Sequence, residues 1–169
     1  MGQSPNGNSY NHSKLGTPLL NGPTEFGDYS PIPKQWTTKP SKFANIGDIL
    51  LTVRGSSTGR MNIADQQYAI GRGLAAIVPA GTSQNFLYVI TEKTVGTFLK
   101  FTTGSTFANV NKDSLKNTVV AYPYSGKEQS CVGLFFNKVD NFIAANQCQQ
   151  KRRNLLNSRV FLKMLYKAS

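Results

Sequence analysis

The sequence predicts an α+β protein, in which a β-rich domain with a few short helices precedes a long C-terminal helix. Three observations predict this. Short apolar runs separated by glycine or proline fill residues 47–124, a proline-free segment with helical periodicity follows, and the N-terminal segment is rich in turn residues. We therefore divide the chain into a β-rich domain, residues 1–126, and a helical arm, residues 127–169.

The N-terminal 45 residues are rich in Gly, Pro, Asn, Ser and Thr, and five prolines fall between Pro18 and Pro40. Proline removes a backbone donor and does not fit the interior of a helix or of a central strand. We therefore expect short edge strands or ordered loops here.

Strand-like runs begin at Gly47. The run "DILLTV" is apolar, partly β-branched and bounded by Gly47 and Gly55, which predicts a buried strand. The runs "YAIG", "LAAIVPA" and "NFLYVIT" follow at short spacing, and "LKNTVVAYPY" closes the series. We expect these runs to form a curved, mostly antiparallel sheet or a barrel, with one short helix near residues 91–99.

A long helix is predicted after Tyr124. Ser125 and Glu128 have the spacing of a capping box, and an apolar stripe with steps of four, three and four follows. Further along the helix the same face is polar, at Asn146, Gln150, Arg153 and Asn157, and it becomes apolar again at Val160 and Met164. The residues expected to contact a partner helix are Val132, Phe136, Val139, Ile143, Val160 and Met164. A helix of about 35 to 40 residues exceeds ordinary globular lengths, which indicates an arm or coiled coil. The sequence leaves open whether the polar middle sets the register with a partner or separates two shorter helices.

The chain is strongly basic, with 19 Lys and Arg against 8 Asp and Glu and a net charge of +11. Such an excess attracts polyanions, chiefly nucleic acid or an anionic membrane, although a basic protein without such a partner is the alternative. No apolar run approaches the roughly 20 residues of a membrane span, and the N-terminus lacks a signal pattern. We expect no membrane partner and a cytoplasmic, reducing setting, with Cys131 and Cys148 buried or half-buried in the helix.

Catalytic and metal-binding motifs are absent from the sequence. The segment "GSSTGRM" lacks the spacing, the lysine and the hydroxyl of a phosphate loop. His12 is the single histidine, and two cysteines are too few for a patterned metal site. We expect no catalytic residues, no metal and no cofactor.

The sequence does contain residues suited to binding a nucleic acid. Arg54, Arg60 and Arg72 lie at predicted strand ends beside glycines, where a guanidinium can reach a base edge or a phosphate. The predicted DNA-binding residues are Arg54, Ser57, Arg60 and Arg72, with Lys34, Trp36, Lys39, Thr103, Ser105, Thr106 and Asn109 in two further loops. The alternative is that Trp36 anchors its loop on the core and that the lysines are merely solvated.

Four segments, in order, resemble the target recognition domain of type I restriction–modification specificity subunits. They are "MGQSPNGNSYN", the block from "FGDYSPIPKQWTTKP" through "GDILLTVRGSSTGR" to "GRGLAAI", then "GSTFANVNKDSLKNTVVAYP", and finally "EQSCVGLFFNKVDNFI". The resemblance spans nearly the whole chain and depends on the order and spacing of the pieces.

The resemblance implies a non-catalytic subunit that binds double-stranded DNA and reads one half of a bipartite site. It also implies partners: methyltransferase modification subunits and a restriction subunit, docked on a helical spacer. The family carries two recognition domains and two helical arms, whereas this chain shows one of each. Either the chain is a fragment, or it is a half-subunit that pairs through its helix with a second copy or a second recognition domain. An alternative is an assembly fragment that docks modification subunits but has poor DNA specificity of its own.

Overall fold

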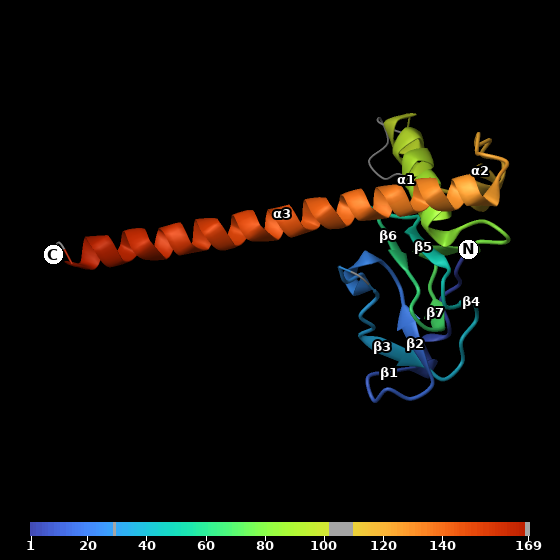
Figure 1. Ribbon diagram of the computed structural model, residues 1–169. Coiled ribbons are helices and arrows are strands. Elements are labelled where there is room, and N and C mark those ends of the chain that lie inside the picture. Colours follow the sequence, from blue (N-terminus) through green and yellow to red (C-terminus); the bar gives the residue numbers. More distant parts are fainter. Residues whose placement is uncertain (29, 102–109, 168–169) are drawn as a thin grey trace.

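The computed structural model describes residues 1–28, 30–101 and 110–167, and it describes side chains at 1–28, 30–96 and 110–154. A β-rich body lies at one end of a single long helix (Figure 1). The body contains two sheets, with α1 (Gln84–Phe101) and the short α2 (Lys112–Lys116) above them near the start of α3 (Gly126–Lys167). The α+β class and the long C-terminal helix predicted from the sequence are confirmed.

One sheet has five short strands. Their order is β1 (Tyr10–Asn11), β3 (Gln35–Thr37), β2 (Thr17–Leu20), β7 (Tyr68–Ile70) and β4 (Phe43–Ala44). All neighbours are antiparallel except β2 and β7, which run parallel. The expectation of edge strands in the N-terminal segment is wrong for β2, which lies in the middle of the sheet, and for β3, which is paired on both sides. Pro18 is tolerated in β2 because the pairing with β7 begins only at Leu19, so the missing donor faces no β7 partner.

The second sheet has three antiparallel strands, in the order β6 (Met61–Ile63), β5 (Ile49–Thr52) and β8 (Leu74–Ile77). β5 is the predicted "DILLTV" strand, and all four of its residues are buried. Neither sheet closes on itself in the strand order of the described residues, so of the two expected forms the open sheet is present and the barrel is not.

The core joins these layers through β5. Leu50 packs with Leu20, Tyr68 and Ile70 in the cluster between the two sheets. The next residue, Leu51, packs with Val95 of α1 and others in a second cluster. Successive strand residues point to opposite faces, so β5 is buried on both sides, by the five-stranded sheet and by α1.

Two expected strands are wrong. The run "NFLYVIT" belongs to α1, which extends well beyond the expected short helix. Thr91 and Val95 lie about one helical turn apart and are buried on one side of α1, and Phe86 is buried on the opposite side. Packing on both sides of the helix overrides the strand preference of its β-branched residues. The run "LKNTVVAYPY" forms the end of α2 and then irregular chain; the Asn111 side chain caps α2 by accepting the backbone N–H of Ser114 at 2.7 Å.

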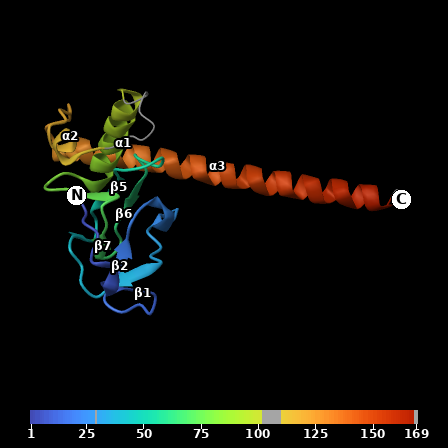
Figure 2. The same ribbon diagram turned by 180° about the vertical axis from the view of Figure 1, so that it is seen from behind.

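α3 is one continuous helix of 42 residues, about 63 Å long at 1.5 Å per residue. This resolves the open alternative of two shorter helices. The backbone N–H of Glu128 points to Ser125 Oγ at 3.5 Å, as the predicted capping pair requires. Every residue from 134 to 154 is exposed, including Cys148, and the helix projects away from the body in both views (Figures 1 and 2). Cys131 is exposed as well, so the expectation of buried thiols is wrong.

α3 is fixed to the body where it crosses α1. Gly133 is buried there, and a Cβ at this position would overlap the backbone nitrogen of Phe86 in α1. Gln129, one turn earlier, is also buried and donates from Nε2 to the carbonyl of Pro123 at 2.9 Å. The direction in which α3 leaves the body therefore depends on a glycine contact. Among the described helices, none is long and apolar enough to cross a membrane.

A pair of glycine substitutions tests this crossing. Gly133→Ala is expected to lower the free energy of unfolding by about 1–3 kcal/mol, because the added methyl overpacks the α1–α3 contact. Gly96→Ala is the matched control in α1, where an added Cβ meets nothing within 4 Å. It should raise the same free energy by about 0.5–1 kcal/mol through helix propensity. Urea denaturation measures both, and equal effects of the two substitutions would contradict the tight crossing.

Candidate nucleic-acid interface

The Arg72 corner is the tight turn that joins β7 to β8. Arg72 is exposed, and its backbone N–H donates to Ser4 Oγ at 3.3 Å. The N–H of Gly71 donates to the carbonyl of Leu20 at 2.8 Å, and the carbonyl of Gly73 accepts the N–H of Val53 at 2.9 Å. The backbone of this corner is therefore held on three sides, while the Arg72 side chain is exposed.

Glycine is required at this corner because three segments meet there. A Cβ on Gly71 or on Gly73 would overlap atoms of Asn21, and a Cβ on Gly2 would overlap the carbonyl of Gly71. The N-terminal segment runs alongside: the N–H groups of Gly2 and Gln3 donate to the carbonyls of Leu74 and Ile70 at 2.8 and 2.9 Å. The segments "MGQSP" and "GRGLA", which both belong to the family resemblance found in the sequence, thus pack directly on one another.

Arg54, Ser57 and Arg60 lie in the loop between β5 and β6. Gly55 and Gly59 have φ values of +87° and +97°, a conformation that glycine adopts without strain. Thr58 Oγ1 donates to the carbonyl of Gly55 at 2.7 Å, and the N–H of Gly59 donates to the carbonyl of Thr52 at 2.9 Å. Both arginines are exposed, and Ser57 is half-buried.

The structure brings Arg54 and Arg72 to the same end of the three-stranded sheet. Arg54 follows Val53, whose N–H binds the carbonyl of Gly73 next to Arg72. Two arginines that lie 18 positions apart in the sequence therefore flank one hydrogen bond. We call this surface, with the loop that carries Ser57 and Arg60, the arginine corner.

Lys34, Trp36 and Lys39 lie elsewhere on the body. Trp36 is in β3 and not in a loop as expected; it is half-buried, opposite Asn11 on one side and Pro18 on the other. Lys14 Nζ lies 5.8 Å from the centre of its ring, a cation–π distance. β2 separates β3 from β7 in the sheet order, so this set does not adjoin the arginine corner along the sheet. The third predicted set, Thr103, Ser105, Thr106 and Asn109, lies outside the described residues.

Two further lysines adjoin the arginine corner. Lys42 is exposed just before β4, and its carbonyl accepts the N–H of Ile70 at 2.9 Å. Lys112 is exposed at the start of α2, after Val110, whose N–H donates to the carbonyl of Val53 at 3.0 Å. Sequence spacing held no signal for this placement, because it results from pairing between distant segments.

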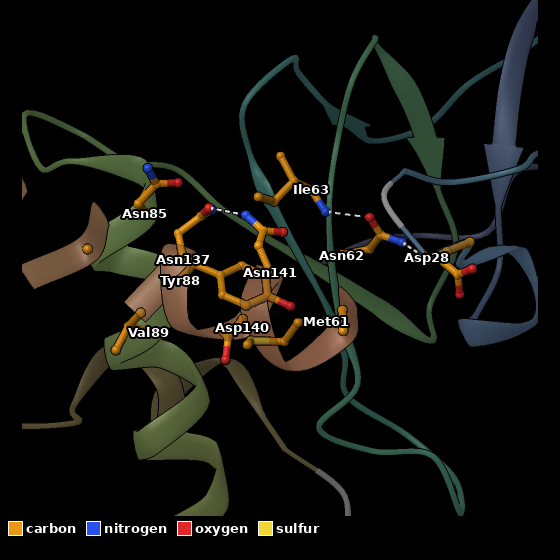
Figure 3. Close-up of a pocket in the computed structure, with 13 residues that line it drawn as sticks. Asp28, Met61, Asn62, Ile63, Asn85, Tyr88, Val89, Asn137, Asp140 and Asn141 are labelled. Atoms are coloured by element: carbon orange, nitrogen blue, oxygen red, sulfur yellow. Dashed lines mark hydrogen bonds between the residues drawn. The ribbon is translucent and has the colours of Figure 1, made fainter. Parts of the chain in front are cut away.

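A cavity of about 310 Å³ lies on another part of the body, where β6, α1 and α3 meet (Figure 3). Its lining is rich in amides, among them Asn62, Asn85, Asn137 and Asn141, with Tyr88 beside them. Asn141 Nδ2 donates to Asn137 Oδ1 at 2.8 Å, and Asn62 Nδ2 donates to the carbonyl of Gly27 at 3.0 Å. Of the predicted DNA-binding residues that the structure describes, none lines this cavity. Within the described part of the chain, no three His, Cys, Asp or Glu residues gather as a metal site would require.

The strand that leads to Arg72 begins at a buried tyrosine. Tyr68 donates its hydroxyl to Asp65 Oδ1 at 2.6 Å and accepts from Gln66 Nε2 at 3.2 Å. Burial, followed by the hydrogen bond to Asp65, raises the pKa of Tyr68 to about 12. A neutral, fully buried phenol therefore anchors β7, the strand that ends at the arginine corner.

The chain combines a two-sheet body, exposed arginines at glycine turns and a long projecting helix. Residues 8–155 match the family profile described as the type I restriction modification DNA specificity domain. Because this match covers most of the chain, the chain belongs to that family. The resemblance inferred from the sequence is confirmed.

Individual relatives agree with this membership. A putative type I restriction enzyme specificity subunit, MjaX, of Methanocaldococcus jannaschii is 48% identical over 77 residues, which are 46% of this chain and 18% of that protein. The crystal structure of the HsdS subunit from Thermoanaerobacter tengcongensis matches 86% of this chain with a TM-score of 0.74 and 31% identity. A structure from work on assembly and conformational transition of the type I R-M system matches 95% of the chain with a TM-score of 0.81 and 29% identity. The chain spans only 35% and 40% of those two solved chains.

The anchor at Tyr68 predicts a stability change at high pH. An unfolded tyrosine ionises near pH 10, whereas folded Tyr68 has its pKa raised to about 12. Its contribution is therefore complete below pH 10 and is lost as the pH rises toward 12, about 2–3 kcal/mol in all. Urea denaturation across this range should show a steeper decline for the wild type than for Tyr68→Phe. Tyr122→Phe, at an exposed position, is the control; equal slopes for the wild type and Tyr68→Phe would contradict the anchor.

Proposed function

We propose that this chain is the DNA-recognition part of a type I restriction–modification specificity subunit. It binds double-stranded DNA, reads one half of a bipartite site and performs no catalysis itself. Residues 1–126 form the recognition domain, and residues 127–169 form the helical arm. The setting is the cytoplasm, where modification subunits and a restriction subunit act on the bound DNA.

The observation that carries this proposal is the arginine corner. Arg54, Arg60 and Arg72 are exposed on backbone that hydrogen bonds and close glycine packing hold in place. Because the backbone of the corner is already fixed, binding costs little further ordering of the main chain. The guanidinium can form paired hydrogen bonds with a guanine edge or a phosphate. The net charge of +11 supplies the long-range attraction to the duplex.

The projecting part of α3 supports the assembly role. Phe136, Val139 and Ile143 of the predicted stripe are exposed by 43%, 37% and 47%, and Val132 is half-buried. Phe135 and Phe142 beside them are exposed by 62% and 69%. Val160 and Met164 lie further along the same helix, where side chains are not described. An apolar helix face of this kind is stable in water only when a partner covers it.

That partner is a second helical arm, from another copy or another recognition domain, together with the modification subunits. The same observation favours one alternative function: a fragment that docks modification subunits through α3 and has poor DNA specificity. The two functions differ in whether the free chain selects a DNA site.

Arginine substitutions test the recognition role. A random-site library should yield one short consensus with the wild-type chain, and a library without a consensus would exclude site selection by the free chain. Arg72→Ala and Arg54→Ala should then weaken binding to the consensus by about 1–3 kcal/mol each, with less change on scrambled DNA, if they reach base edges. Arg152→Ala, exposed on α3, is the control. A loss that is equal on both duplexes would assign the arginines to phosphate contacts.

Charge on the α3 stripe tests the assembly role. Phe136→Asp and Ile143→Asp should weaken self-association and binding to the modification subunit by roughly tenfold or more, because a carboxylate would be buried against an apolar partner. Ala145→Asp, exposed on the opposite side of the helix, adds the same charge and should have little effect. Sedimentation velocity and pull-down with the purified modification subunit measure the two interactions. If both persist in the stripe variants, the stripe is not the interface.

A further inference from the structure

Lys42 lies beside the strand that leads to Arg72. Its carbonyl accepts the N–H of Ile70 at 2.9 Å, so the backbone of Lys42 is fixed to the residue that lies two positions before Arg72. Its side chain is exposed. The lysine therefore belongs to the same rim of the body as the arginine corner.

Lys112 approaches the corner from the other side. The link between Val110 and Val53 fixes the chain just before Lys112 against the residue that precedes Arg54. Lys112 and Met1 line the same cavity of about 380 Å³ between β8, α1 and α2. Met1 in turn leads into Gly2 and Gln3, whose N–H groups are bound to the β7–β8 corner. Lys112 and Arg72 thus flank one short N-terminal segment.

Electrostatics agree with this placement. The pKa of the Met1 amino group is lowered, first by burial and then by the charges of Lys112 and Lys42. Both lysines are therefore close enough to Met1 to repel its charge. The two lysines therefore lie near Met1, while the backbone of Arg72 is bonded to Ser4 and Arg54 follows Val53, which is bonded to the residue after Arg72.

Among the described residues, these charges have no compensating partner. In the described part of the chain, none of the four side chains forms an ion pair with a carboxylate or a hydrogen bond with another side chain. Gathered like charge raises the energy of the free protein and is relieved when a polyanion binds. The four residues also carry two different charged groups, guanidinium on the arginines and ammonium on the lysines. A guanidinium can bind a base edge through paired bonds, whereas an ammonium acts as a point charge that suits a single phosphate.

We propose that Lys42 and Lys112 each contact a backbone phosphate of the DNA on either side of the arginine corner, so that they set affinity and position while the arginines read the bases. This inference rests on the proposed function and adds two residues and a division of roles to it. Phosphate contacts release counterions, so each should add about 0.9 to the slope of log K against log salt.

The test uses the full chain, Lys42→Gln, Lys112→Gln and the double variant. Equilibrium binding is measured by fluorescence anisotropy across a salt series, on a short synthetic duplex with the selected site and on a scrambled duplex of equal composition. Each single variant should lose about eightfold in affinity at ~0.1 M salt on both duplexes and lower the salt slope by about 0.9. The double variant should lower the slope by about 1.8. Lys151→Gln, exposed on the projecting part of α3, is the matched control and should change neither quantity.

The outcomes separate this inference from the proposed function. Specific wild-type binding with unchanged slopes in both lysine variants would overturn the phosphate contacts and leave the recognition role intact. A loss confined to the selected site would overturn them as well, because the lysines would then read bases. Equal losses on both duplexes in a wild type that selects no site would support the contacts and overturn site reading. A wild type that binds neither duplex would overturn both.

Discussion

Burial of β5 on both faces is the constraint on which the rest of the structure depends. Leu50 packs toward the five-stranded sheet and Leu51 toward α1, so this one strand joins the two sheets and the helical layer. The chain just after β5 is equally constrained, because Val53 is fully buried and bonded through both its N–H and its carbonyl to distant segments. The loop that carries Arg54 therefore starts from a rigid point of the body, which is what the base contact proposed for Arg54 would need.

Local rules predicted part of this fold. Strands β5, β7 and β8 are short apolar runs bounded by glycine, and each bounding glycine is explained by a positive φ or a close approach. β2 and α1 were not predictable in the same way. Pro18 favours an edge, yet β2 is central because its pairing with β7 begins one residue later. The β-branched residues of α1 favour a strand, yet the segment is helical because Phe86 and Val95 are buried on opposite sides of it. The two errors have different causes. In α1, tertiary packing outweighed a local preference of less than about 1 kcal/mol per residue, whereas in β2 the proline lies where no β7 partner is opposite it.

Some residues of the candidate site could be predicted from local sequence, and others could not. Arg54, Arg60 and Arg72 could be predicted because each sits beside a glycine at the end of a strand, a relation visible within a few residues of sequence. Lys42 and Lys112 join them only through contacts that cross the chain, from β4 to β7 and from residue 110 to Val53. Trp36 shows the opposite error: its basic neighbours suggested a recognition loop, but pairing on both edges places it in a sheet.

The position of α3 has a consequence for how binding and assembly are coupled. From residue 134 to 154 the helix is exposed throughout, so a partner can cover its stripe without displacing any part of the body. The helix nevertheless has a set direction, because Gly133 fits against Phe86 with no room for a side chain. α1 also packs on Leu51 through Val95, and Leu51 lies two residues before Val53 and the arginine corner. A partner that holds α3 would therefore orient the arginine corner through two packed contacts, at Gly133 and at Val95.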